Sequence, residues 1–386
     1  MRGKLIKKVV IVGGGSSAML AAAFISNNTP YKVTVIDKED GAPIGVGEAT
    51  LINFGPFMSA CGFDFKEWFK YCDATYKTGI LFPGWTKKEV WHPFKMNPMS
   101  KLTDFNKEDR NGFHVDCLKL AKFIKDKIKN KVTFIDGTVS HIDGHFVNTD
   151  KGKITADVFI DCTGFASVLQ EKKKVDLSNR LICDTAVAGH VEYKNKKEKR
   201  KYVICEAVSC GWIWKIPVKH RIGTCIVFNR SITSPEEASE IFNNHWNGRV
   251  KIRKVINWTP YYKPNFWKHN VISLGLAGGF IEPLESTGLA LAMEGAYQFV
   301  QLTRNGYGNA ATSNLYNAIM KSFYEESIDF ITMHYIISNR KEKFWQKARK
   351  LKRPFQINYY NSKLKEPLNY PNNQYSFFGG NNWVTW

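Results

Sequence analysis

A turn of three glycines at positions 13–15 constrains the fold of this chain more than any other stretch. The apolar residues 5–12 before it are typical of a β-strand, and residues 18–26 after it favour a helix. The turn has the spacing Gly-x-Gly-x-x-Ala in a strand, turn and helix order, which is the pattern of a dinucleotide-binding βαβ unit. The sequence therefore predicts an α/β, Rossmann-like fold.

Four small residues have separate roles in this pattern. Gly13 permits the tight turn, and Gly15 lets the backbone approach a pyrophosphate. Ala18 permits close packing of the helix, and Ser16 stands at the helix N-terminus, whose partial positive charge faces the phosphates. We therefore predict that Gly13, Gly15, Ser16 and Ala18 bind the cofactor.

An acidic residue follows the second expected strand. Residues 32–36 are apolar and end in Asp37, which is placed to accept hydrogen bonds from the ribose hydroxyls of the cofactor. This favours an unphosphorylated adenosine, as in FAD or NAD. The alternative role for Asp37 is a helix cap after the strand.

The composition is that of a globular protein, because 44% of the 386 residues are hydrophobic and 14% are aromatic. The 8 cysteines are scattered without paired spacing or nearby histidine clusters. This pattern indicates neither a zinc site nor a disulfide framework, so we expect no metal and a reducing, cytoplasmic setting.

The net charge of +20 raises the question of a nucleic-acid or membrane partner. The excess lies in residues 194–201, which are typical of a solvated loop, and in residues 340–353, where we expect a helix with Phe344 and Trp345 facing inward. Neither run contains a nucleic-acid motif, and no apolar stretch has transmembrane length. We expect no specific nucleic-acid partner and no membrane partner.

Two tryptophans separated by one residue lie in the run Gly211–Pro217. On a strand, Trp212 and Trp214 share a face, and by themselves they indicate core packing. Three further blocks accompany them: residues 44–50 (Ile-Gly-Val-Gly-Glu-Ala-Thr), residues 76–80 (Tyr-Lys-Thr-Gly-Ile) and residues 280–288 (Phe-Ile-Glu-Pro-Leu-Glu-Ser-Thr-Gly). Together with Trp-x-Trp-x-Ile-Pro, these blocks resemble the flavin-dependent halogenases of the tryptophan halogenase family.

The resemblance implies FAD, used as FADH2, with a halide ion and O2. Residues 44–50 resemble the strap loop that crosses the flavin, and residues 156–164 resemble the second flavin-side motif of the larger hydroxylase and halogenase superfamily. These segments add five residues to the expected cofactor site: Gly47, Glu48, Ala49, Asp161 and Gly164. Because the chain has a single nucleotide fingerprint, we expect a separate flavin reductase as a transient partner.

The chemistry implied by the resemblance rests on two side chains. Lys77 matches the catalytic lysine, although an exposed lysine is the commoner interpretation of that residue type alone. Glu285 matches the catalytic carboxylate and would act as a general base. Thr287 and Gly288, at the start of an expected helix over residues 289–302, would hold the halide with backbone amides. Hypohalous acid would reach Lys77, as a haloamine or as a hydrogen-bonded acid, and then halogenate an arene.

Aromatic residues define the expected substrate pocket. His92 and Phe94 resemble the aromatic walls of the family, and Trp212 and Trp214 would separate flavin from substrate. His334, with its neighbour Tyr335, resembles a family position that we interpret as scaffold. The chain is shorter than typical tryptophan halogenases, so the substrate is predicted only as a small electron-rich aromatic of indole or phenol type.

Two other functions stay open from the sequence. An FAD-dependent hydroxylase would add oxygen to an arene, and a catalytically silent flavin-binding protein would turn nothing over. The predicted organisation is an FAD-binding core over residues 1–300, including substrate-side strands near 60–110 and 181–260, and a helical substrate-covering region over residues 301–386. Residues 131–160 are expected to be antiparallel, and a homo-oligomer is compatible with the sequence.

Overall fold

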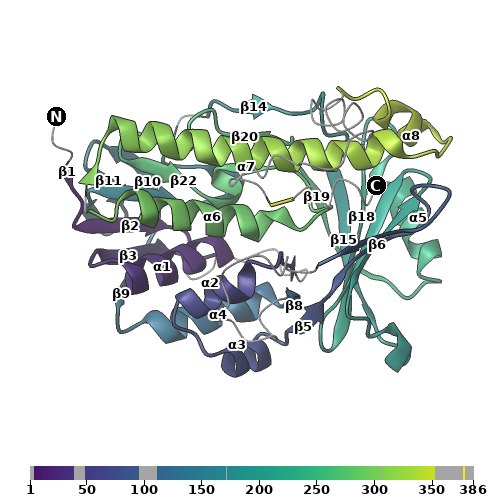
Figure 1. Cartoon of the computed structure of the whole chain (residues 1–386), viewed down its shortest axis with the longest axis horizontal. Coiled ribbons are helices and arrows are strands. Elements are labelled where there is room, and N and C mark those ends of the chain that lie inside the picture. Colours follow the sequence, from purple (N-terminus) through teal and green to yellow (C-terminus); the bar gives the residue numbers. More distant parts are fainter. Residues whose placement is uncertain are drawn as a thin grey trace, which may run out of the picture.

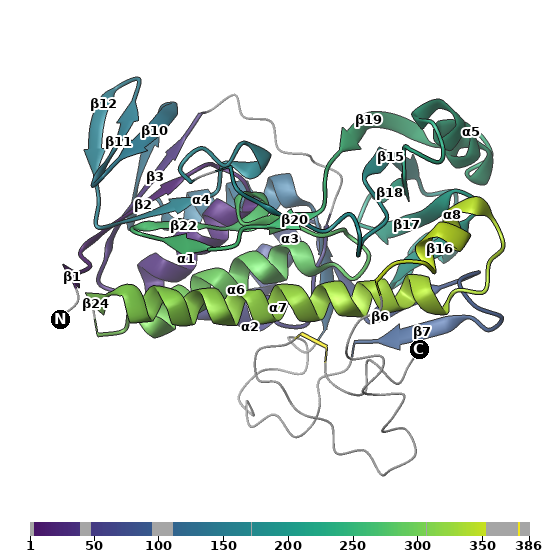
Figure 2. The same ribbon diagram turned by 90° about the horizontal axis from the view of Figure 1, so that it is seen from above.

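The computed structural model describes residues 4–38, 48–94, 111–170, 172–305, 307–352 and 377–378. Its two large sheets are a six-stranded sheet that leads into the glycine loop and a seven-stranded sheet that contains the paired tryptophans (Figure 1). One long helix, α7 (Ala310–Ile337), runs past both sheets (Figure 2).

The six-stranded sheet has the order β21-β22-β13-β2-β3-β9, and all neighbouring strands are parallel except β21 and β22. Its strands are β2 (Lys8–Val12), β3 (Lys32–Asp37), β9 (Val132–Asp136), β13 (Val158–Asp161), β21 (Trp267–Lys268) and β22 (Val271–Ser273). Val12 of the central strand β2 is in register with Ile36 on one side and with Asp161 on the other. The carboxyl ends of β2, β3 and β13 therefore meet at one edge, where parallel α/β sheets bind their ligands.

Helix α1 (Ser16–Asn28) packs on this sheet, and α4 (Cys117–Ile128) and α6 (Thr287–Leu302) pack on α1. Helix α1 is buried at every position from 18 to 25 and is rich in alanine, because α4, α6 and β3 all contact it. A helix that is apolar all round belongs inside a core, whereas α4 exposes its lysines and buries one face. Helix α1 thus occupies the centre of the cofactor half.

The seven-stranded sheet has the order β19-β15-β18-β17-β16-β6-β7. Its strands are β6 (Gly79–Phe82), β7 (Val90–Pro93), β15 (Thr185–Glu192), β16 (Val203–Val208), β17 (Gly211–Pro217), β18 (Arg221–Phe228) and β19 (Lys251–Asn257). Alternation along β17 sends Trp212 and Trp214 into the main core and Ile213 into a second core beneath α5 (Pro235–His245). Both faces of the sheet are therefore packed.

A three-stranded sheet joins the two halves, with the order β4-β8-β5. It consists of β4 (Glu48–Ala49), β5 (Thr75–Lys77) and β8 (Gly112–Val115). Only Thr78 separates β5 from β6 of the seven-stranded sheet. Lys77 therefore lies where the small sheet passes into the large one.

The remaining elements are short or peripheral. The strands are β1 (Lys4–Leu5), β10 (Val139–Asp143), β11 (Phe146–Thr149), β12 (Gly152–Thr155), β14 (Val175–Asp176), β20 (Tyr261–Tyr262), β23 (Gly279–Phe280) and β24 (Tyr307–Gly308). The helices are α2 (Phe54–Ala60), α3 (Phe65–Tyr71) and α8 (Lys343–Ala348). Helix α8 buries Phe344 and Trp345, which confirms their inward orientation.

The α/β fold class is confirmed, and one local expectation is wrong. Residues 139–155 form an antiparallel sheet, but β9 and β13 on either side of it are parallel members of the six-stranded sheet. Apolar runs of this length fit either direction, so the sequence alone does not distinguish them. The division of the chain at residue 300 stays a prediction, because α7 packs on α6 and on β21 of the core. In the described part of the chain, no helix has the length and apolarity to cross a membrane.

Candidate active site

The glycine loop has the geometry that a bound dinucleotide requires. Gly13 has φ of 118°, its amide donates to the carbonyl of Ile36 at 2.8 Å, and a Cβ there would lie 2.4 Å from the carbonyl oxygen of Cys162. Only glycine fits this position. A Cβ on Gly15 would meet no atom within 4 Å, so the space before helix α1 is open to a pyrophosphate.

The other predicted residues of this loop lie around it. Ala18 is fully buried, and the Ser16 hydroxyl lies 3.5 Å from the carbonyl oxygen of Cys117. A Cβ on Gly14 would lie 1.7 Å from Asp37 Oδ2, so the Asp37 carboxylate covers the middle of the loop. The structure thus brings Asp37 to the glycine loop, and its contact with a ribose stays a prediction.

Asp161 organises the loop after β13. Its Oδ1 accepts hydrogen bonds from the amide of Thr163 at 3.0 Å and from the Thr163 hydroxyl at 2.6 Å, and its Oδ2 accepts from the amide of Leu169 at 2.9 Å. Gly164 in this loop has φ of 68° and an open space where a Cβ would point. Asp161 holds the loop that presents Gly164, and direct contact of either residue with the cofactor stays a prediction.

The strap segment is described only at its end. Gly47 lies outside the described residues, whereas Glu48 and Ala49 form β4 and pair with Val115 and His114 of β8. The next residue, Thr50, is fully buried, and its hydroxyl accepts a hydrogen bond from the amide of Phe113 at 2.9 Å. This anchor places the end of the strap beside Lys77.

Lys77 is fully buried at the end of β5. Its Nζ donates to the carbonyl oxygen of Thr50 at 3.1 Å and to the Ser286 hydroxyl at 2.9 Å, and it lies 4.1 Å from the ring centroid of Phe94. Burial lowers the pKa of Lys77 to about 7 despite the opposing influence of Glu285 and Cys205. Near neutral pH, a large share of this amine is therefore unprotonated and nucleophilic.

Glu285 is a fully buried carboxylate between two histidines. His92 Nδ1 lies 3.1 Å from its Oε2, and His334 Nε2 lies 2.6 Å from its Oε1. Burial raises the pKa of Glu285, but the charges and hydrogen bonds of His92 and His334 outweigh it and bring the pKa to about 2. Glu285 is therefore an ionised group.

The contacts of His334 place a proton beside this carboxylate. Its Nδ1 lies 2.7 Å from the carbonyl oxygen of Phe330, which only accepts, so Nδ1 carries a hydrogen. Its Nε2 faces Glu285, and an ionised carboxylate also only accepts. Both contacts are satisfied only when the His334 and Glu285 pair holds one proton more than a neutral imidazole and a carboxylate. Burial lowers the pKa of His334 against the opposing influence of Glu285, so the extra proton is held within the contact between His334 Nε2 and the Glu285 carboxylate.

Helix α6 begins two residues after Glu285, with Ser286 as its N-cap. Ser286 has a left-handed backbone with φ of 62°, which is uncommon for a residue with a side chain, and its hydroxyl accepts from Lys77. Thr287 is buried and its Oγ1 has no hydrogen-bond partner among the described residues, while Gly288 is exposed and a Cβ there would meet nothing. The amides of a first helical turn lack partners within the helix. The start of α6 can therefore accept an anion, and halide binding by Thr287 and Gly288 stays a prediction.

The residues predicted to form the substrate pocket are almost completely buried. His92 faces inward to Glu285 with Phe94 beside it, the ring centroids 5.3 Å apart, while Trp91 points outward and is 39% exposed. Phe378 stacks on Phe330 at 4.1 Å, and the Phe330 ring also contacts His92. These aromatic rings cover the outer side of the Glu285 cluster, and contact of His92 or Phe94 with a substrate stays a prediction.

The paired tryptophans occupy the core of the seven-stranded sheet. Trp212 is fully buried and its indole Nε1 donates to the hydroxyl of Tyr335 at 2.8 Å, whereas Trp214 is 6% exposed. Packing therefore accounts for their shared face, and a role at the substrate pocket stays a prediction.

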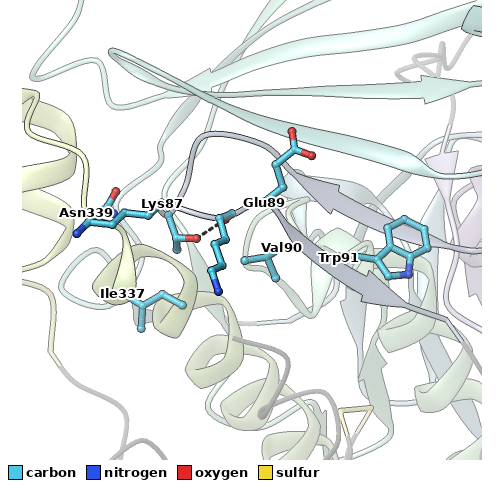
Figure 3. A pocket seen from close by; sticks show the side chains of 8 residues that line it. Lys87, Glu89, Val90, Trp91, Ile337 and Asn339 are labelled. Atoms are coloured by element: carbon cyan, nitrogen blue, oxygen red, sulfur yellow. Dashed lines mark hydrogen bonds between the residues drawn. The ribbon is translucent and has the colours of Figure 1, made fainter.

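A cleft of about 540 Å³ lies on the outer side of β7, away from Lys77 and Glu285. It is lined by the turn before β7 and by the end of α7, with the Lys87, Val90 and Ile337 side chains around the opening (Figure 3). None of the predicted site residues lines it.

Sequence reasoning missed several residues of the Lys77 and Glu285 cluster. His334, which we interpreted as scaffold, binds Glu285 directly; a histidine inside an apolar helix was the available signal. His114 is fully buried, and its Nδ1 lies 2.9 Å from the Thr75 hydroxyl. Because that hydroxyl donates to the carbonyl of Pro217, His114 must donate from Nδ1, which leaves its Nε2 as an acceptor without a partner among the described residues.

The chain's own residues fit a bound FAD. There is room for a cofactor between the glycine loop and the start of α6, because a Cβ would point into open space at Gly15, Gly164 and Gly288. The buried Thr287 Oγ1 also lacks a hydrogen-bond partner in the described ranges. Within those ranges no group of three or more His, Cys, Asp or Glu side chains is arranged to hold a metal ion.

Comparison with known proteins identifies the family. The family model described as tryptophan halogenase matches residues 8–107 and 94–385. Tryptophan 7-halogenase KtzQ of Kutzneria sp. (strain 744) is 26% identical over 83% of this chain and 74% of its own length. The solved structure of Tar14, a tryptophan C-6 flavin-dependent halogenase from taromycin biosynthesis, is 25% identical, with a TM-score of 0.82 over 92% of this chain and 83% of that chain.

The tryptophan 6-halogenase SttH from Streptomyces toxytricini shares the fold over nearly the whole chain. Its TM-score is 0.89 at 23% identity, covering 99% of this chain and 90% of that chain. The fold, the buried Lys77 and Glu285 cluster and the family match agree. The chain belongs to the tryptophan halogenase family and is a flavin-dependent halogenase.

Proposed function

We propose that this enzyme halogenates an electron-rich arene of the indole or phenol class, with Lys77 as the carrier of the halogen and Glu285 as the base. The observation that carries the proposal is that Lys77 Nζ binds the Ser286 hydroxyl at 2.9 Å, so the amine is tied to the residue next to Glu285. An amine with a lowered pKa and an ionised carboxylate that influences it are thus both buried away from water.

The cofactor half supports the oxidising step. Gly13, Gly15 and Asp37 would hold the adenosine and pyrophosphate of FAD. The loop that presents Gly164 and the end of the strap at Glu48 and Ala49 would face the rest of the cofactor. When bound, reduced FAD would supply two electrons to O2, the oxidant, so that FADH2, O2, halide and a proton give FAD, hypohalous acid and water. Thr287 and Gly288 at the start of α6 would hold the halide.

Lys77 then receives the halogen. Its neutral amine either hydrogen-bonds the hypohalous acid or attacks the halogen, which forms an N–X bond and releases water once the proton is transferred. Thr50 and Ser286 orient the amine, and the Phe94 ring covers it. Both forms deliver an electrophilic halogen from one fixed position.

Glu285 removes the proton that the arene loses. When the ring attacks the halogen, the bond from halogen to its donor breaks, and the ring carbon must then release a proton to restore aromaticity. His334 and His92 hold the Glu285 carboxylate ionised and fix its orientation for this transfer.

The substrate assignment stays general. KtzQ and SttH are named as tryptophan halogenases, and an indole is therefore the first substrate class to test. A single nucleotide-binding loop in the described chain supports delivery of FADH2 by a separate flavin reductase.

The decisive experiment is product mass. The protein is incubated with FAD, a flavin reductase, NADH, bromide and a panel of tryptophan, indole and phenol, with catalase to remove peroxide. We expect a brominated product that disappears in Lys77→Ala, because no other described amine is tied to Ser286, while flavin binding persists. A hydroxylated product would replace the halogenase assignment with a monooxygenase, and Lys77→Ala with full activity would remove Lys77 from the mechanism.

A further inference from the structure

A second buried carboxyl lies three residues before Glu285. Glu282 is 1% exposed, its Oε1 accepts a hydrogen bond from the Tyr335 hydroxyl at 2.5 Å, and its Oε2 is buried without a partner among the described residues. In the described ranges it forms no ion pair. The mechanism above does not use this residue.

Two consecutive residues of α7 bind the two carboxyls. His334 binds Glu285 at 2.6 Å, and Tyr335 binds Glu282 at 2.5 Å. The short segment before α6 is thus attached to α7 at two points, one on each side of Pro283 and Leu284. The carbonyl of Leu284 also lies 3.8 Å from the Cys205 thiol of β16.

Trp212 fixes Tyr335 from the opposite side. An indole N–H only donates, so the Tyr335 oxygen accepts from Trp212 at 2.8 Å and its own proton is available for the contact with Glu282. Trp85 packs on both rings, with centroids 5.4 Å from Tyr335 and 6.5 Å from Trp212. The Cys183 Sγ also lies 3.3 Å from the Tyr335 oxygen, so the hydroxyl is held by three buried neighbours, Trp212, Glu282 and Cys183.

Among the described residues, no positively charged group lies beside Glu282 to keep it ionised. The titratable groups that face it are Tyr335 on α7, Cys183 before β15 and Cys205 on β16, and burial raises the pKa of all three, so each is neutral at neutral pH. Burial likewise raises the pKa of Glu282 to about 8, against a smaller lowering by the Tyr335 hydrogen bond. The geometry and the apolar surroundings both favour the protonated carboxyl.

We propose that Trp212, Tyr335 and a protonated Glu282 form a positioning relay that fixes the segment carrying Glu285 and Ser286. Through Ser286 the relay sets the place of Lys77, and through Glu285 it sets the place of the base. This inference rests on the proposed roles of Lys77 and Glu285. It gives the paired-tryptophan motif a function at the reaction centre without contact with flavin or substrate.

The relay predicts that hypohalous acid escapes when its hydrogen bonds are removed. Tyr335→Phe keeps the ring and removes the hydroxyl that contacts Trp212, Glu282 and Cys183, and Trp212→Phe replaces the indole with a smaller aromatic ring that lacks the N–H donor. We expect the ratio of brominated arene to free hypobromous acid, captured by a diketone trap, to fall by about tenfold, because a small displacement of reacting groups is enough for such a loss. Lower folding yield alone reduces both products together and leaves this ratio unchanged.

Trp246→Phe is the matched control. Trp246 is also buried and donates its indole N–H at 3.3 Å, to the Thr224 hydroxyl, but it lies in the second core on the opposite face of the same sheet. We expect its ratio to equal that of the wild type. An equal ratio in Trp212→Phe as well would overturn the relay.

The charge of Glu282 is tested by a pH profile. As pH rises through about 8, ionisation of the wild-type carboxyl places an unpaired charge in the core, so the ratio should fall. Glu282→Gln keeps the shape and the hydrogen bond but cannot ionise, so its ratio should stay level above pH 8. Glu282→Leu should show the low ratio at every pH.

The results separate this inference from the proposed function. If the wild type brominates a panel arene in a Lys77-dependent way, but Glu282→Gln follows the wild-type profile and Tyr335→Phe keeps the wild-type ratio, the relay is wrong and the halogenase mechanism stands. If the wild type makes no brominated product, the proposed function itself fails.

Discussion

At the scale of single residues, burial of the Lys77 amine lowers the stability of the folded protein. Lys77 is buried with a pKa of about 7, whereas the same side chain in the unfolded chain titrates near 10.5. Between these values the unfolded chain binds a proton that the folded chain lacks, so wild-type stability rises with pH across this window. Below pH 7 the folded protein bears the full cost of burying the charged amine.

We therefore predict that Lys77→Met stabilises the protein while it abolishes halogenation. The amine costs roughly 5 kcal/mol at most by its pKa shift, and its two lost hydrogen bonds return about 1 kcal/mol each, so we expect a gain of about 2 to 3 kcal/mol at pH 7. The gain should shrink as pH approaches 10. Thermal unfolding midpoints of both proteins at several pH values measure it, and a gain independent of pH would contradict the buried amine.

At the scale of elements, the turn between β2 and α1 contains two glycines that are needed for different reasons. At Gly13 a side chain would collide with the Cys162 carbonyl and strain a backbone with φ of 118°. At Gly15 the backbone is ordinary, with φ of −74°, and a Cβ would point into open space. The first glycine serves the fold, and the second keeps room for the cofactor.

Two alanine substitutions test this distinction. Gly13→Ala should destabilise the protein by about 2 kcal/mol or more through strain and collision. Gly15→Ala should change stability by less than about 1 kcal/mol, yet weaken FAD binding by about tenfold or more because a methyl group occupies the space facing the pyrophosphate. Thermal unfolding and flavin fluorescence quenching measure the two effects. Equal loss of stability in both variants would refute the assignment.

The sequence predicted those helices and strands that are determined by short-range sequence patterns. The glycine turn predicted β2, α1 and β3, and alternation along β17 predicted the shared face of Trp212 and Trp214. It could not predict that His334 meets Glu285, because 49 residues separate them and the contact depends on how α7 packs against the start of α6. The direction of β9 was missed for a related reason, since pairing with β3 is a long-range contact.

At the scale of the whole molecule, one chain combines a cofactor sheet and a second sheet around a single buried cluster. Helix α7 runs past both sheets (Figure 2), and near its C-terminal end it supplies His334 and Tyr335 to the cluster. The described chain contains one nucleotide-binding loop, which is assigned to FAD. This supports the proposal that reducing equivalents enter with the flavin.

We predict that the protein with FAD does not oxidise NADH at a significant rate, and that FADH2 generated by a reductase or by chemical reduction supports the same bromination. Absorbance of NADH at a fixed FAD concentration measures the first part, and product mass measures the second. Rapid NADH oxidation by the protein alone would indicate a nicotinamide site and favour the hydroxylase alternative.

The single residue between β5 and β6 has a consequence for engineering. Thr78 alone links β5, the strand of Lys77, to β6 of the seven-stranded sheet. In a chimera that replaces this sheet with the corresponding sheet of another protein, Lys77 would be exchanged together with the sheet unless the junction between the two parent sequences lies within one peptide unit of position 78. When the seven-stranded sheet is exchanged between proteins of this fold, only a short stretch of sequence around position 78 is therefore suitable as the junction. Outside it, a hybrid would bind flavin and generate oxidant while its carrier amine is out of place.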